Sequence, residues 1–318
     1  MFGSNSRGRP ALRAKSSADD QAMRLFVLVI GAYLVVALAM PLYAMLSKSM
    51  LNSDGSFTGF TNYVAYFQTP ALVYSIKNSL FVGVLTTSIT VTIAFLLAYA
   101  LTRSRMPAKP VFKTVAMIPI LVPSLLPGIA LIYLFGRQGL ITGLLFGNDI
   151  YGPIGIVIAE VFFTLPHALI IITTALSIAD SRLYEAAVSL RASRVRIFFT
   201  VTIPGVRYGL ISAAFVVFTL SVTDFGAPKV IGGDFNVLAT DIYKQVIGQQ
   251  NFEMGAVVSV ILLIPAGLAF FVDRVVQKKQ VAQVSSGAVA LVPTPNKRFD
   301  NLMFAYALAV SVFVVGML

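Results

Sequence analysis

Few side chains in this sequence are suited to chemistry. The chain has no cysteine and one histidine, His167, which excludes thiolate chemistry and multi-histidine metal sites. Glu160 lies seven residues before His167 in one apolar run, so a helix would place both on one face. Such a pair could relay protons, or Glu160 could be protonated or paired inside a helix bundle. Asp224, at the end of a later apolar run, could contact a substrate or cap that region.

The composition is that of a membrane protein. Of 318 residues, 57% are hydrophobic and 12% are charged, and the mean hydropathy is +0.85. An ordinary soluble domain has about 25% charged residues. The net charge of +11 is spread between apolar runs, which favours a topology signal over nucleic-acid binding. Because no catalytic set, metal cluster or cofactor loop is found, we predict neither an enzyme nor a bound cofactor or metal.

Seven apolar runs are long enough, or nearly so, to cross a bilayer core as helices, for which about 20 residues suffice. We therefore expect an all-α membrane protein with six spans, followed by the first helix of an incomplete second unit. The runs are residues 25–46, 78–102, 114–136, 153–175, 208–223, 254–272 and 301–318.

Prolines interrupt the third run at four-residue steps, at Pro119, Pro123 and Pro127. Each removes a backbone donor and is expected to bend the helix. In a membrane such breaks persist only against protein or a water-filled cavity. The run is therefore either a kinked helix that lines or gates a pathway, or a tolerated structural bend.

Lysine and arginine are distributed unequally between the two sides of these spans. Nineteen of the 24 basic residues fall on the side of the amino terminus, and five fall on the other. The positive-inside rule places the more basic side in the cytoplasm. We expect a cytoplasmic tail at residues 1–24, a six-span domain at 25–276 and a cytoplasmic linker at 277–300, which is polar and contains no run of span length.

The cytoplasmic connection at 176–207 contains the segment EAAVSLRASRVRIFFTVTIP, residues 185–204. Apolar residues recur there at helical spacing, with charged residues between them, so we expect an amphipathic helical element ended by Pro204-Gly205. Either it lies on lipid headgroups, or it is a docking surface for a cytoplasmic partner, because its small alanines would permit close approach of another backbone.

This segment resembles the cytoplasmic signature loop of type I ABC importer permeases. That pattern is Glu-Ala-Ala, three residues, Gly, nine residues, an aliphatic residue, one further residue and Leu-Pro. Six of its seven positions match identically or conservatively, and Arg191 stands where glycine is usual. Because arginine rarely adopts the positive φ that glycine tolerates, we expect the bend to use another backbone conformation or to be displaced.

The resemblance, which covers residues 25–276, implies a permease without ATPase activity of its own. In the family this loop docks in a groove of a cytoplasmic ABC ATPase dimer. ATP-driven closure of the two ATPase subunits then switches the pore from an inward-facing to an outward-facing conformation. The residues that this implies for ATPase coupling are Glu185, Ala186, Ala187, Leu190, Arg191 and Pro204. The sequence contains no GxxxxGK[ST] phosphate loop, so a separate subunit would hydrolyse ATP.

The family also implies further partners. The run at 301–318 looks like the start of a second permease half, fused to or separate from the first, and we interpret the chain as a fragment of a fused permease. A periplasmic solute-binding protein would dock on the outer loop at 226–253 and deliver the substrate. The protein would lie in a bacterial inner membrane.

The substrate is indicated by resemblance alone. Residues 223–252, TDFGAPKVIGGDFNVLATDIYKQVIGQQNF, are similar to permeases for 2-aminoethylphosphonate, and fused iron(III) permeases share a looser form. Polyamine import is a further alternative. Two rival classes are a proton-coupled secondary transporter that uses Glu160 and His167, and a membrane scaffold that moves no substrate.

Overall fold

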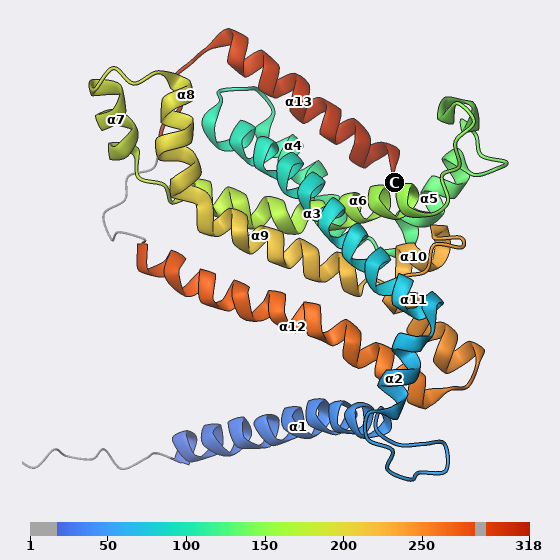
Figure 1. Ribbon diagram of the computed structural model, residues 1–318. Helices are drawn as coiled ribbons and strands as arrows, with labels where there is room; N and C mark the ends of the chain where they lie inside the picture. The colour runs from blue at the N-terminus through green and yellow to red at the C-terminus, as the bar shows by residue number, and fades with distance from the viewer. Residues whose placement is uncertain (1–17, 284–290) are drawn as a thin grey trace, which may run out of the picture.

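The computed structural model describes residues 18–283 and 291–318, and helices dominate both ranges (Figure 1). Within those residues the β-structure amounts to an isolated antiparallel bridge between Leu51 and Phe57. In the part of the chain that the structure describes, six helices are long and apolar enough to cross a membrane, and a bent pair would make a seventh span. The prediction of an all-α membrane protein is confirmed.

The elements in chain order are α1 (Ala18–Lys48), α2 (Thr61–Gln68), α3 (Pro70–Arg103), α4 (Lys109–Met117), the 3-10 turn η1 (Ile118–Leu121), α5 (Leu125–Phe135), the 3-10 turn η2 (Thr142–Leu145), α6 (Pro153–Ser177), α7 (Ser181–Ser189), α8 (Arg194–Ile197), the π segment η3 (Phe198–Thr202), α9 (Ile203–Thr223), α10 (Gly226–Ile231), α11 (Leu238–Tyr243), the π segment η4 (Lys244–Gly248), α12 (Phe252–Gln283) and α13 (Lys297–Gly316).

The centre of the molecule is formed by α3, α6 and α9, each of which packs against the other two, while α12 packs on α9. Lipid tails are as apolar as leucine, so close packing and buried hydrogen bonds hold membrane helices together. Thr90 of α3 and Thr164 of α6 share a buried hydrogen bond of 3.1 Å between their hydroxyls. A Cβ at Gly83 of α3 would lie 2.4 Å from Val222 of α9, so glycine permits this crossing.

The third apolar run is broken, as its prolines predict. The helical pieces Lys109–Leu121 and Leu125–Phe135 meet at an angle of 104°. Pro119 lies in η1 and Pro123 lies in the break itself. Pro127 instead occupies the first turn of α5, where its missing N–H breaks no helical hydrogen bond. Two of the three prolines therefore lie at or beside the bend, and the third does not bend the helix.

The fifth span is longer than expected. Helical structure runs from Arg194 through η3 into α9, and the whole stretch to Thr223 qualifies as one span. The expectation that Pro204-Gly205 ends the amphipathic element is wrong, because Pro204 lies in the first turn of α9. The N–H of Ile203 bonds to the carbonyl of Phe198 five residues earlier, and this wider π turn carries the chain into the proline.

The end of the bundle opposite α7 and α8 carries short elements, which include α2, α10 and α11 (Figure 1). We call it the α10 end, and the other the α7 end. α10 follows the break of the fifth span at Asp224 and packs on α5. A Cβ at Gly226 would lie 2.3 Å from the hydroxyl of Ser124, so a side chain there would separate the two helices.

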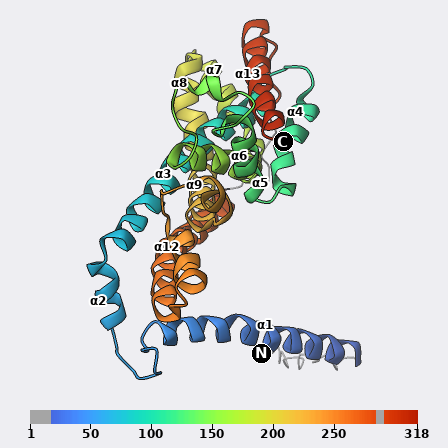
Figure 2. The same cartoon turned by 90° about the vertical axis from the view of Figure 1, so that its right-hand side faces the viewer.

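Two long helices flank this bundle in different ways. α1 packs on α12 near one of its ends, but its most apolar stretch is 0% buried. Most of α1 therefore stands apart from the bundle in both views (Figures 1 and 2). α13 instead packs on α3 and α4. The rings of Phe304 and Phe112 lie 5.3 Å apart, and the hydroxyl of Tyr306 donates to the carbonyl of Ile93 at 3.0 Å.

Helices replace parts of the expected linker at 277–300. α12 extends to Gln283, and α13 begins at Lys297, four residues before the apolar run. Residues 284–290 of that linker, and residues 1–17 of the expected tail, lie outside the described residues.

Candidate functional site

The candidate site is the segment formed by α7, the turn at residues 190–192, α8 and the start of η3, at one end of the bundle (Figure 1). We call residues 181–199 the coupling surface. α7 begins because Asp180 caps it: the Asp180 carboxylate accepts a hydrogen bond of 3.1 Å from the N–H of Arg182. Ser193 caps α8 in the same way, at 3.3 Å from the N–H of Arg196. Two local caps therefore define a helix–turn–helix.

Arg191 itself makes the turn. Its φ is +56°, in the left-handed region that favours glycine. The N–H of Arg191 bonds to the carbonyl of Val188 at 2.8 Å, and that of Ala192 to Ala187 at 3.0 Å, which is the Schellman pattern that ends a helix. The expectation of a different or displaced bend is wrong, because arginine keeps the bend and adopts the conformation usual for glycine.

The coupling surface exposes both apolar and basic side chains. Five of its large apolar side chains are each more than half exposed, and Leu190 reaches 82%, whereas Ile197 and Phe198 are half-buried. A contiguous apolar patch rimmed by polar residues is typical of a protein interaction site. The exposed apolar residues are Leu183, Val188, Leu190, Val195 and Phe199, and the exposed basic ones are Arg182, Arg191, Arg194 and Arg196.

The structure brings most of the predicted coupling residues onto this surface. Glu185, Ala186, Leu190 and Arg191 are exposed, and Ala187 is half-buried. The Glu185 carboxylate accepts one intrahelical hydrogen bond of 3.3 Å from the hydroxyl of Ser181, so one face of it is open to a partner. Pro204 is exposed but belongs to α9, and therefore lies outside the helix–turn–helix.

The predicted pathway residues are placed differently from one another. Glu160 is fully buried in α6, and neither carboxyl oxygen has a hydrogen-bond partner among the described residues. Asp224, at the end of α9, lies close enough to interact electrostatically with the Glu160 carboxyl. The Asp224 carboxylate also accepts a hydrogen bond of 2.9 Å from the N–H of Ala227, and so caps α10. His167 is half-buried beside the ring of Phe163, at 5.9 Å between centroids.

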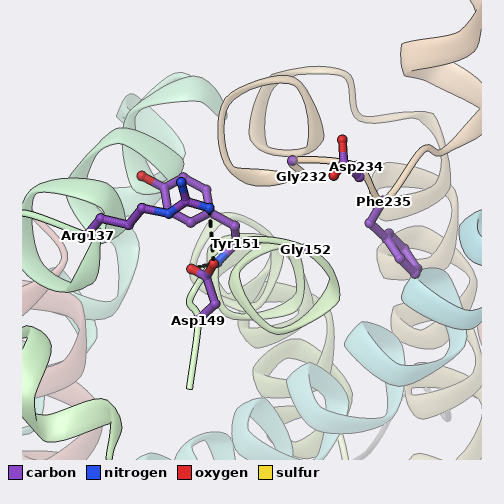
Figure 3. Close-up of a pocket in the computed structure, with 8 residues that line it drawn as sticks. Arg137, Asp149, Tyr151, Gly152, Gly232, Asp234 and Phe235 are labelled. Carbon is purple, nitrogen blue, oxygen red and sulfur yellow. Dashed lines mark hydrogen bonds and ion pairs between the residues drawn. The ribbon is translucent and has the colours of Figure 1, made fainter. Parts of the chain in front are cut away.

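The α10 end is hollowed by a cleft of about 550 Å³ (Figure 3). Arg137 lies alongside the ring of Tyr151, 5.9 Å from its centroid, and 3.9 Å from the carboxylate of Asp149. Asp234 and Phe235, from the turn after α10, line the other side. An ion pair this exposed stabilises a fold by about 0–1 kcal/mol, so its charges are available to a partner.

One buried acid lies near this end but outside the spans. Asp241 of α11 is 4% exposed, and burial raises the pKa of its carboxyl, while a hydrogen bond from Ser75 and the charge of Lys244 act in the opposite direction. Among the described residues, no group of three or more acidic, histidine or cysteine residues is arranged to hold a metal ion.

Sequence reasoning missed Arg103 and Tyr184, which meet beneath the coupling surface. The guanidinium of Arg103 lies 5.1 Å from the centroid of the Tyr184 ring. Arg103 entered the charge count as one basic residue among 24, and no pattern linked it to a tyrosine 81 positions later. An arginine at the end of a span, beside a connection of this length, is the signal that could have drawn attention to it.

The left-handed conformation of Arg191 predicts how substitutions at this position change hydrogen exchange in the turn. A left-handed residue other than glycine costs roughly 1–2 kcal/mol, and a β-branched one costs more. Arg191→Gly should therefore leave hydrogen exchange at the amides of residues 191 and 192 unchanged or slower. Arg191→Val should make it about tenfold faster, equivalent to about 1.4 kcal/mol. Equal protection in the two variants would contradict a strained turn.

Comparison with known proteins shows which family the sequence resembles. The sequence profile of the family described as "Binding-protein-dependent transport system inner membrane component" matches residues 90–281. The ferric transport system permease protein FbpB of Actinobacillus pleuropneumoniae is 34% identical over 216 residues, which cover 64% of this chain and 31% of that protein. A spermidine/putrescine permease homologue, PotC of Mycoplasma genitalium, is 29% identical over 178 residues, 56% of this chain and 59% of that protein.

Solved structures agree on the fold. A bacterial ABC transporter that imports the acidic polysaccharide alginate superposes with a TM-score of 0.64 at 14% identity, over 84% of this chain and 97% of that one. The chain spans about a third of the length of the ferric permease and of a second one from Haemophilus influenzae, of which it covers 33%. Because the family profile matches more than half of its residues, the chain belongs to the inner-membrane permease components of binding-protein-dependent ABC importers.

Proposed function

We propose that this chain forms half of the substrate pathway of an ATP-driven importer, and that a separate ATPase binds its coupling surface. The observation that carries the proposal is the exposure of apolar and basic side chains on α7, which lies outside the spans, and on α8, at the start of the fifth span. Both helices lie at the end of the bundle opposite α10 and α11 (Figure 1). A helix lying in the lipid interface would bury its apolar face at the boundary between headgroups and acyl chains. α7 instead projects from the end of the bundle, which favours a cytoplasmic protein partner.

A second permease half is the next partner that we propose. Near its start α13 contains Asp300-Asn301-Leu302-Met303, and α1 has the similar Asp20-Gln21-Ala22-Met23 just before its apolar stretch. We therefore interpret α13 as the first helix of a second half, here packed on α3 and α4. If the halves are related by a two-fold axis, α1 packs on the corresponding helices of the second half. That contact would cover the bare apolar surface of α1.

The orientation of the chain is a further proposal, with the α7 end in the cytoplasm. The chain lacks cysteine, so single cysteines can be introduced without removing others. Leu190 at the α7 end and Leu140 at the α10 end are exposed to similar degrees, 82% and 84%. In intact spheroplasts a membrane-impermeant maleimide should label Leu140→Cys and leave Leu190→Cys unlabelled until the membrane is permeabilised. The reverse pattern would refute both the orientation and the ATPase site.

At the opposite end we propose docking of a periplasmic solute-binding protein. A solved structure of the alginate transporter is a complex with a periplasmic protein carrying an alginate pentasaccharide, which is the kind of assembly meant here. The cleft with Arg137, Asp149 and Asp234 offers charges of both signs at this end. Such rim charges set partner choice and association rate more than affinity.

For the substrate we propose 2-aminoethylphosphonate, on the resemblance of residues 223–252. Lys229 in that segment belongs to α10 and is exposed, and its ammonium lies over the Tyr243 ring, 4.3 Å from the centroid, so a positive charge is held at the α10 end. A phosphonate anion would be attracted to it. Ferric iron is the second candidate, because two relatives 34% identical are named as ferric permeases.

The proposal is tested with the complete transporter in proteoliposomes, supplied in turn with radiolabelled 2-aminoethylphosphonate and ferric citrate, each with its binding protein. We expect uptake of the phosphonate that requires ATP and stops when the ATPase subunit is omitted. Uptake of iron but not of the phosphonate would refute the proposed substrate and still support ATP-driven import. Uptake that continues without the ATPase and collapses with a proton ionophore would identify a secondary transporter instead.

A further inference from the structure

Beneath the coupling surface, one guanidinium contacts two other elements. Arg103 is the last residue of α3, and its Nη2 donates to the carbonyl of Leu176, in the last turn of α6, at 2.8 Å. A cation there also interacts favourably with the helix dipole. The same Nη2 lies 3.5 Å from the hydroxyl of Tyr184 in α7, and the guanidinium faces the Tyr184 ring. Arg103 therefore joins α7 to the ends of two spans.

Tyr184 continues the connection to a third span. Its hydroxyl donates to the hydroxyl of Thr202 at 3.1 Å, and Thr202 is 1% exposed at the end of η3. η3 is anchored in turn on α3, because the ring of Phe198 lies 5.9 Å from Phe95 and 5.8 Å from Tyr99. Among the described residues, the side-chain hydrogen bonds that tie α7 to other elements are those of Tyr184.

The position of this pair matters because α7 packs weakly on the bundle. α3, α6 and α9 pack extensively on one another, whereas α7 is not among the helices in close contact with them. A force applied to the exposed face of α7 would reach the spans through its turns and through Tyr184. One of the elements that would receive this force is η3, a π segment, and such segments are rare and recur at functional sites.

We propose that Arg103 and Tyr184 form the joint through which movement of α7 is passed to α3, α6 and α9. Arg103 holds α7 to α3 and α6, and the Tyr184 hydroxyl holds α7 to η3 and α9. Both are positioning residues, since they touch neither ATP nor substrate. The inference rests on the proposed ATPase docking, and it adds the route by which that docking reaches the pathway.

The test measures each connection separately with pairs of spin labels. One pair joins Ser189→Cys on α7 with Thr92→Cys on α3, and the other joins Ser189→Cys with Ile211→Cys on α9; all three sites are exposed. Distance distributions are recorded by pulsed electron resonance on the complete transporter in nanodiscs, before and after trapping with ATP and vanadate.

We expect the two variants to give crossed results. Tyr184→Phe keeps the ring beside Arg103 but removes the bond to Thr202, so the α7–α9 distribution should widen about twofold and the α7–α3 distribution should stay narrow. Arg103→Gln should do the opposite. A general loosening of the fold would widen both distributions in both variants, which would overturn the proposal.

The chain supplies a matched control pair of the same chemistry. Arg207 donates to the hydroxyl of Tyr208 at 3.1 Å and lies 4.7 Å from its ring centroid, but both residues belong to α9 and bridge no elements. Tyr208→Phe and Arg207→Gln should leave both distributions unchanged.

Two further results keep the inference open to refutation. If Arg103→Gln fails to assemble, a cycle of Tyr184→Phe, Thr202→Val and the double variant decides, because a shared bond requires the double variant to match each single one. Additive widening would overturn the joint. If the ATPase fails to co-purify with the unaltered chain, the proposed function is refuted. If it co-purifies and the crossed pattern is missing, the joint alone is refuted.

Discussion

Glu185→Lys should abolish ATP-driven uptake while leaving the chain folded and inserted in the membrane. Glu185 is exposed on α7, and its carboxylate has one intrahelical hydrogen bond, so the substitution removes little from the fold. If α7 docks in a groove of the ATPase, the new ammonium would be buried where a carboxylate belongs. Loss of one member of a buried charged pair weakens binding by about 3 kcal/mol, or more than a hundredfold.

The measurement is co-purification of the ATPase with the detergent-solubilised permease, followed by uptake in proteoliposomes. Asp149→Lys is the control, because it makes the same change of charge at an exposed acid at the α10 end. It should leave ATPase binding intact. Normal ATPase binding by the Glu185→Lys variant would remove the docking role from Glu185.

Gly209→Leu should unfold the centre of the bundle, whereas Gly205→Leu should be tolerated. Both glycines lie in α9, four residues apart. A Cβ at Gly209 would come within 2.4 Å of the Cβ of Ala175 on α6, and one at Gly205 would meet no atom within 4 Å. Four side-chain carbons at the crossing would force α6 and α9 apart, at a cost of about 3 kcal/mol or more.

Thermal unfolding in detergent, followed by size-exclusion chromatography, measures the difference. Gly209→Leu should lower the apparent unfolding temperature by roughly 6–12 °C, at 2–4 °C per kcal/mol. Gly205→Leu should raise it slightly, because leucine is a better helix former than glycine by about 0.5–1 kcal/mol. Similar unfolding temperatures for the two variants would show that the helix crossing is wider than described.

The spans and the coupling surface were predictable because local rules govern them. An apolar run of about 20 residues becomes a helix in a bilayer wherever it occurs, since no other structure satisfies its backbone. The exposed face of α7 follows from apolar spacing and from a local cap at Asp180. Pro123 likewise marked the break of the third span, because a missing N–H acts on the helix that contains it.

Features that depend on distant contacts were not predictable in the same way. The spacing of Glu160 and His167 placed them on one helix face, but packing of α3, α9 and α10 around α6 buries Glu160 completely and His167 only in part. At Arg191 a residue preference pointed to a changed bend. The hydrogen bonds of the turn instead hold arginine at φ +56°.

Composition and periodicity were therefore enough to predict a helical membrane protein, its spans and the exposed amphipathic stretch between two of them, because these depend on the transfer of each segment between water and lipid. Folding decided which helices meet, where glycine permits a crossing, and that Arg103, Tyr184 and Thr202 form one connection. The physical reason is that those contacts join residues of different helices, and their geometry depends on how whole helices pack.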